Sequence, residues 1–169
     1  MKYLEIILIP VCILAIILNL TNITGGVLLT FIALLLLAIL YLIFSFAIFN
    51  NISLINTVDP ESYKSISISK ILGAISAGVA LFLTIIGVLY KVSFWEYANN
   101  ILVLGLICLF LNLAINLIGY FKNQNYFYSK IIKRLVIFFI LGFVLLLNSK
   151  ESLFHFKYRN NQGYIKAVQ

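Results

Sequence analysis

The sequence predicts an all-α integral membrane protein of about five transmembrane helices, arranged as two hairpins and a final span within one membrane domain. Of its 169 residues, 63% are hydrophobic and 10% are charged, and the mean hydropathy is +1.12. An ordinary soluble domain carries about 25% charged residues, so a water-soluble fold is excluded. Neither Ile71–Tyr90 nor Ile101–Tyr120 contains a charged side chain. As helices rising about 1.5 Å per residue, both match the roughly 30 Å hydrocarbon core of a bilayer.

The first hairpin is predicted over residues 4–49. Its first apolar run, Leu4–Leu20, is interrupted by Glu5 and carries Pro10, which transmembrane helices tolerate. A polar turn without charge, Asn19–Gly26, separates this run from Val27–Phe49, a run long enough to span with some tilt.

The second hairpin, residues 71–120, follows a polar connection at residues 50–70. In that connection, Asp59-Pro60-Glu61 is typical of a helix start, and it predicts a short interfacial helix. The turn of the second hairpin holds an interfacial motif. Trp95 is an amphipathic ring that favours the membrane–water boundary, and Lys91 and Glu96 are expected to reach the lipid headgroups.

Two sets of residues in this hairpin predict helix packing. Gly73 with Ala77, and Ala74 with Gly78, form pairs of small residues four apart, a spacing that lets another helix approach closely. Asn112 and Asn116 share one face of the next helix, where buried amides need partners. Packing is the main interpretation of this polar face, and a solute pathway is the alternative.

The final span is predicted at residues 131–147, before a polar tail at residues 148–169. Its wholly apolar part, Leu135–Leu147, is short for a span. With Lys133 and Arg134 snorkelling outward, the run reaches about 17 residues, the lower limit for crossing a bilayer. Hydrophobicity therefore favours five spans. The four Lys and Arg of the tail favour a four-span alternative, which keeps them on the cytoplasmic side.

The distribution of Lys and Arg predicts a cytoplasmic N-terminus in either case. The outer connections then receive Lys91, and the remaining basic residues before the tail face the cytoplasm. These residues are Lys2, Lys64, Lys70, Lys122, Lys130, Lys133 and Arg134. The net charge of +7 lies at the ends of apolar runs rather than in one stripe, so no nucleic-acid partner is expected.

The two hairpins read alike when Asn19 is aligned with Lys91, which predicts two copies of one unit. The second turn, Gly87–Leu102, also resembles the transmembrane hairpin of the GldL-type proteins of Bacteroidota gliding motility and type IX secretion. That pattern reads roughly G-x-L-F-K-I-x-H-W-P-G-A. Gly87, Leu89, Lys91, Trp95 and Ala98 match it, whereas Phe94, Glu96 and Tyr97 depart from its His, Pro and Gly.

The resemblance implies a small inner-membrane protein of that lineage. The motor hairpin couples proton flow through a membrane-buried Glu in its second helix, and the matching region Gly105–Asn112 contains no acid. Because a proton relay needs an ionisable group inside the membrane, motor activity is not implied.

No enzymatic activity is predicted. His155 is the single histidine, Asp59 and Glu61 form no acid–base constellation, and there is no phosphate loop or metal-ligand spacing. We therefore expect no cofactor. The predicted partners are membrane lipids and either a second copy or another membrane protein. The resulting hypothesis is a multi-pass inner-membrane scaffold or accessory subunit of a membrane complex. The alternative is a small pore-forming or transport protein.

Overall fold

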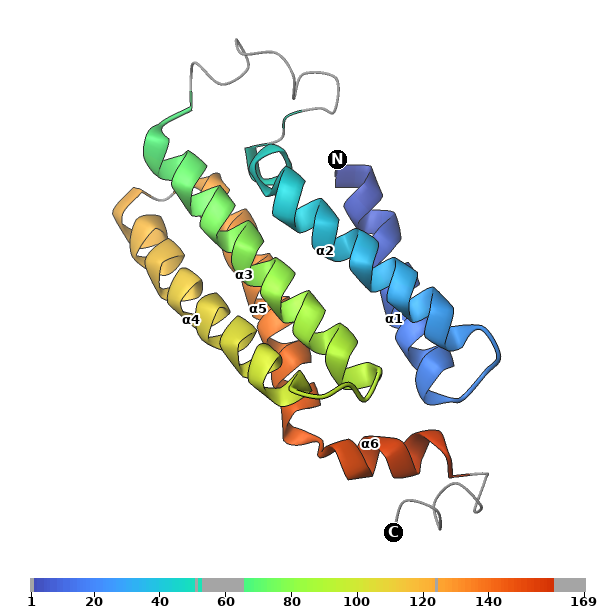
Figure 1. Cartoon of the computed structure of the whole chain (residues 1–169). Coiled ribbons are helices and arrows are strands. Elements are labelled where there is room, and N and C mark those ends of the chain that lie inside the picture. The colour runs from blue at the N-terminus through green and yellow to red at the C-terminus, as the bar shows by residue number, and fades with distance from the viewer. Residues whose placement is uncertain (1, 51, 53–65, 124, 160–169) are drawn as a thin grey trace.

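The computed structural model describes residues 2–50, 52, 66–123 and 125–159, and these ranges form an all-α bundle (Figure 1). Its helices are α1 (Lys2–Leu20), α2 (Gly26–Asn50), α3 (Ile68–Val92), α4 (Ala98–Asn123), α5 (Tyr126–Leu147) and α6 (Lys150–Lys157). The predicted fold class is confirmed. The interfacial helix predicted near Asp59 lies outside the described residues.

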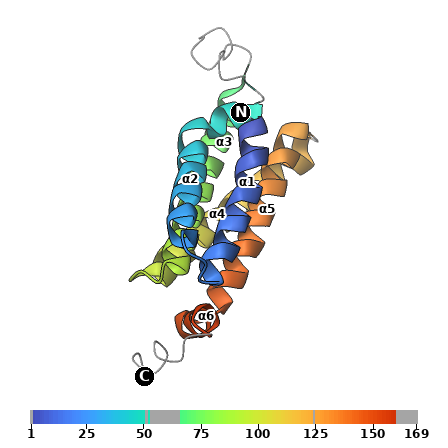
Figure 2. The same ribbon diagram turned by 90° about the vertical axis from the view of Figure 1, so that its right-hand side faces the viewer.

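The first five helices run alternately up and down the bundle. Helices α2, α3 and α4 form one layer, and α1 and α5 lie behind it (Figures 1 and 2). Helix α3 is central, because it contacts α1, α2, α4 and α5. The N-terminus marks one end of the bundle, here called the N-terminal end. Both hairpin turns lie at the opposite end, here called the turn end.

Helices α1 to α4 are each long and apolar enough to cross a membrane. The bent pair of α5 and α6 gives a fifth span when the two helices are counted as one. The protein is therefore a multi-pass membrane protein. Helix α5 begins at Tyr126 rather than at the predicted residue 131. Asn125 explains the earlier start, since its side chain accepts the backbone N–H of Phe127 at 3.0 Å and caps the helix.

Helix α6 is absent from the sequence prediction, which assigns its residues to a polar tail. It follows α5 at a bend of 88° and lies across the turn end. Ser149 caps it by accepting the N–H of Ser152 at 3.0 Å. Lys150 donates to the backbone carbonyl of Trp95 in the second turn, and Lys157 donates to Asn19 Oδ1 at 2.6 Å. The helix thus connects the two hairpin turns.

The two hairpin turns share one backbone conformation in the register that the sequence predicts. Asn22 and Phe94 occupy equivalent positions with φ values of 56° and 60°. Each turn also has a backbone hydrogen bond that spans five positions, from Ile23 to Leu18 and from Trp95 to Tyr90, both at 3.0 Å. This match in three dimensions supports the sequence repeat.

Glycines bring neighbouring helices into backbone contact. A Cβ atom added to Gly78 of α3 would lie 2.2 Å from Ser45 Oγ and 2.7 Å from the Tyr41 carbonyl oxygen, both on α2. On the other side of α3, a Cβ at Gly87 would lie 2.6 Å from Leu102 Cα. In contrast, a Cβ at Gly73 would meet no neighbour closer than an oxygen of the α4 amide Asn116, at 4.0 Å. Close packing therefore holds α3 between α2 and α4.

The glycine contacts predict opposite effects for two matched substitutions. Gly78→Ala should lower the free energy of unfolding by about 1–3 kcal/mol, because the new methyl group overlaps α2. Gly73→Ala should leave it unchanged or raise it slightly, since alanine favours helix by roughly 0.5–1 kcal/mol. Thermal unfolding in mild detergent measures both. Equal stability of the two variants would contradict the α2–α3 packing.

The path of α5 predicts that the two ends of the chain lie on opposite sides of the membrane. A reporter that is active on one side only, fused after Gln169, should give the opposite signal to the same reporter fused before Met1. Equal signals would instead support the four-span alternative.

Candidate functional site

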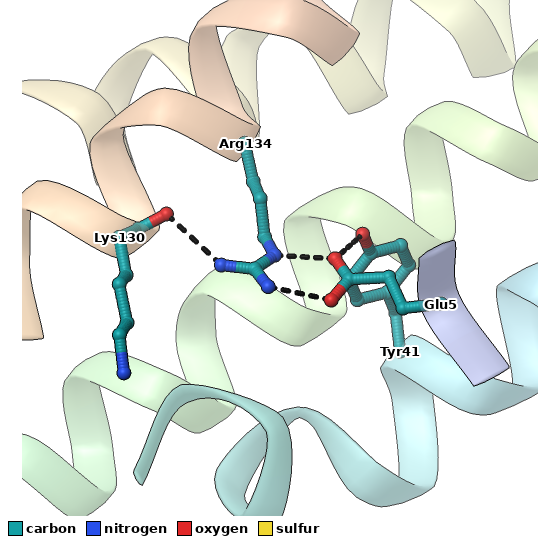
Figure 3. A network of polar contacts seen from close by, with 4 residues as sticks. All are labelled: Glu5, Tyr41, Lys130 and Arg134. Atoms are coloured by element: carbon teal, nitrogen blue, oxygen red, sulfur yellow. Dashed lines mark hydrogen bonds and ion pairs between the residues drawn. The ribbon is translucent and has the colours of Figure 1, made fainter. Parts of the chain in front are cut away.

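A cluster of polar side chains joins three helices inside the bundle near its N-terminal end. Glu5 comes from the first turn of α1, Tyr41 from α2, and Arg134 from α5 (Figure 3). The side chain of Glu5 is 4% exposed and that of Arg134 is 20% exposed. Residues 129 positions apart in the chain therefore form an ion pair that is largely shielded from its surroundings.

Every polar atom of the Glu5 carboxylate is engaged. Arg134 Nε donates to Oε1, and Nη2 donates to Oε2 at 2.5 Å, so the pair is bidentate. Tyr41 Oη donates to Oε1 at 2.6 Å. The third guanidinium nitrogen reaches the Lys130 carbonyl at 3.3 Å, and the guanidinium carbon lies 5.4 Å from the centre of the Phe49 ring. Planar, bidentate pairing of this kind is the strongest geometry that arginine offers a carboxylate.

The arrangement favours a structural role for the cluster over a chemical one. An ion in a low-dielectric medium loses several kcal/mol of solvation, and close pairing is needed to recover it. Here each charge is met by the other and by a further hydrogen bond. The Glu5 carboxylate accepts three hydrogen bonds from within the chain and lies almost wholly buried. The cluster therefore fastens α1 and α2 to α5.

The direction of Arg134 corrects the sequence prediction, in which it snorkels outward with Lys133. Lys133 is exposed, whereas Arg134 turns inward toward Glu5. The physical reason is the buried carboxylate, which gives the guanidinium a better partner than the membrane surface. The signal in the sequence is Glu5 itself, since a charged residue within an apolar span implies a partner.

The predicted small residues lie on two sides of α3. Ala74 and Ala77 are fully buried, and Gly78 is buried against α2. Gly73 is only half-buried and lies toward α4. The structure therefore separates the predicted set, with three members in the core and Gly73 near the surface between α3 and α4.

The predicted amides of α4 form a polar ladder with α3. Ser76 Oγ donates to Asn112 Oδ1 at 2.7 Å. Asn112 Nδ2 donates to the Cys108 carbonyl at 3.0 Å, and Asn116 Nδ2 donates to the Asn112 carbonyl at 2.8 Å. Asn116 is buried, but Ser76 is exposed on the outer surface of the bundle. The ladder thus runs from the core to the surface.

The residues of the predicted interfacial motif differ in exposure: Trp95 and Glu96 lie on the surface, whereas Lys91 is buried. Trp95 is 44% exposed and packs edge-on against Tyr90, and Glu96 is exposed. The prediction that Lys91 reaches the headgroups is wrong. Lys91 is fully buried, and its Nζ donates to Asn99 Oδ1 of α4 at 2.6 Å. The tight turn places Asn99 within reach of Lys91, so the ammonium group is bound inside the hairpin.

Within the described ranges, no group of three His, Cys, Asp or Glu side chains could hold a metal ion. Comparison of the chain with protein-family models, with curated proteins and with solved structures gives no match. A function for this protein must therefore be inferred from the geometry of its polar residues.

The ion pair predicts strong coupling between Glu5 and Arg134. Glu5→Gln and Arg134→Gln should each lower the free energy of unfolding by about 3–5 kcal/mol, because each leaves a buried charge without its counter-ion. Glu5→Gln combined with Arg134→Gln should cost less than the sum of the two single changes, because the double variant leaves neither charge unpaired. Denaturant or thermal unfolding in mild detergent measures this cycle.

Lys133→Gln is the matched control for the cycle, because this neighbouring cation is exposed and its replacement should change stability by less than about 0.5 kcal/mol. Additive effects of the two paired substitutions would show that the residues do not stabilise each other.

Proposed function

We propose that the protein is a non-catalytic scaffold or accessory subunit of a membrane complex. The observation that carries this proposal is the exposed end of the polar ladder, where Ser76 and Asn112 meet on the outer surface of α3 and α4. Apolar residues close to this pair in the sequence are also exposed: Leu72 and Ile75 of α3, which precede Ser76, and Ile115 of α4, which follows Asn112. A hydroxyl–amide pair in an apolar, membrane-facing surface is a site that a second transmembrane helix can cover favourably.

The shape of this surface supports the same proposal. Gly73 lies one turn before Ser76, and an added Cβ there has no neighbour closer than 4.0 Å, so the surface beside the polar pair is shallow. Small residues next to a hydrogen-bonding side chain are the usual features of contacts between transmembrane helices. The occupant is therefore proposed to be a transmembrane helix, either from another protein or from a second copy of this chain.

The polar groups inside the bundle fit this role better than a pore. The Asn112 and Asn116 amide nitrogens donate to carbonyl groups of their own helix, and both oxygens of the Glu5 carboxylate accept hydrogen bonds from Arg134 and Tyr41. A conducting path needs polar groups that can exchange partners with a moving ion.

Kinship with the GldL-type hairpin proteins of an inner membrane is part of the proposal. It is supported by the motif at Lys91 and Trp95 and by the paired hairpins.

Affinity purification in mild detergent tests the proposed interface. The tagged chain should retain a second copy or another membrane protein, and Ser76→Leu should weaken that retention about three- to thirtyfold, as expected for a lost contact between membrane helices. Ile107→Leu is the control, because Ile107 is 53% exposed on a different face of α4. Recovery of the wild type solely as a monodisperse monomer would contradict the proposal. Ion or solute flux through reconstituted protein would favour the pore.

A further inference from the structure

A second surface feature lies on the opposite side of the bundle from the polar ladder. An apolar groove of about 260 Å³ separates α1 from α5, and α2 and α3 form its floor. Its floor includes Leu37 and Ile85, which are each 1% exposed. Its rims are open, since Ile13 on α1 and Ile137 on α5 are 47% and 53% exposed.

The chemistry of the groove determines which medium fills it. Every lining residue is apolar, and the groove lies within the membrane-spanning part of the helices. A water molecule would find none of the two to four polar partners that it needs. An empty groove would forfeit dispersion contacts along its whole lining. Hydrocarbon is therefore the favoured content, and the surrounding bilayer supplies it.

The end of the groove nearest the N-terminal end of the bundle is positively charged. The groove-lining face of α5 continues by helical spacing from Ile137 to Lys133 and Lys130, and Lys133 is exposed. Glu5 is the acidic residue at this end among the described residues, and both of its oxygens are already bound. The net charge of the described residues facing the membrane surface here is thus positive. At the other end, α6 lies across the bundle and Lys157 is held by Asn19.

We propose that this groove binds one acyl chain of an anionic phospholipid, with the phosphate of the headgroup at the exposed Lys133. The apolar groove and the cation one turn before it match the two parts of such a lipid in their order along α5. Basic residues at the membrane surface attract anionic headgroups, and the groove gives one acyl chain a fixed position between α1 and α5. The site is separate from the proposed partner surface on α3 and α4.

Native mass spectrometry of the full chain tests the site. The protein is released from nanodiscs that contain equal amounts of dioleoyl phosphatidylglycerol and dioleoyl phosphatidylcholine, which differ in headgroup charge but not in acyl chains. The wild type should retain phosphatidylglycerol preferentially. Lys133→Gln should reduce that preference about fivefold, whereas Lys122→Gln, at the end of α4, should not.

Groove-filling variants test the position of the acyl chain. Ile137→Trp should lower retained phosphatidylglycerol to the level of phosphatidylcholine, and Ile140→Trp should not, because Ile140 is 55% exposed and lies outside the groove. Ile13→Trp repeats the test from the α1 wall, with Leu14→Trp as its control, so that one unstable variant does not decide the result.

Three outcomes would overturn the lipid site. These are equal retention of both lipids by the wild type, equal retention by the groove and control variants, and a dimer that the groove variants abolish. The last outcome would assign the groove to a second copy of the chain. Because the readout is bound lipid, failure here is distinguishable from failure to retain a protein partner.

Discussion

The bidentate pairing of Glu5 with Arg134 is the interaction on which the arrangement of the bundle depends. Helix α5 carries three cations in its first half, at Lys130, Lys133 and Arg134, which is unfavourable for a helix that enters hydrocarbon. The pairing neutralises the innermost of these with a carboxylate from α1, and Tyr41 completes the coordination of that carboxylate. In a medium without water, neither charge has a comparable partner elsewhere among the described residues. The last long helix is therefore directed against the first, although their sides are otherwise separated by an apolar groove.

The remaining architecture depends on how the two similar hairpins are held together. The two hairpin turns have equivalent conformations, and the equivalent residues Asn19 and Lys91 are both buried at them. Each needs a polar partner, and the chain supplies it differently: Lys91 binds Asn99 within its own hairpin, whereas Asn19 binds Lys157 of α6. The two hairpins, α1–α2 and α3–α4, do not by themselves form a closed bundle. Helices α5 and α6 complete it, with the ion pair at one end and the contacts to the turns at the other.

Much of this fold was predictable, because apolar runs and polar turns are local signals. These signals predicted both hairpins, the alignment of Asn19 with Lys91 between their turns, and a last helix near residues 131–147. The errors concern long-range partners. Arg134 turns inward because of a residue 129 positions away, and no periodicity encodes that distance. Lys91 is buried because the turn returns Asn99 to it. Helix α6 did carry a local signal, Ser149 followed by Glu151, but its average polarity hid an element whose stability comes from contacts with the turns.

The positions of the polar groups favour a scaffold: those in the interior have partners within the chain, whereas Ser76 lies on the outer surface. A transporter needs interior groups that exchange partners, whereas the amides of Asn112 and Asn116 and the Glu5 carboxylate are held by partners in the same chain. The two proposed binding surfaces, the groove between α1 and α5 and the face of α3 and α4 at Ser76, lie on the outside of the bundle. Occupants that bind only the assembled bundle stabilise it by mass action. A lipid chain between α1 and α5 would therefore reinforce the same closure as the ion pair, and a helix over Ser76 would act on the opposite side. A bound lipid and a partner helix would thus stabilise the same bundle that the ion pair between Glu5 and Arg134 holds together.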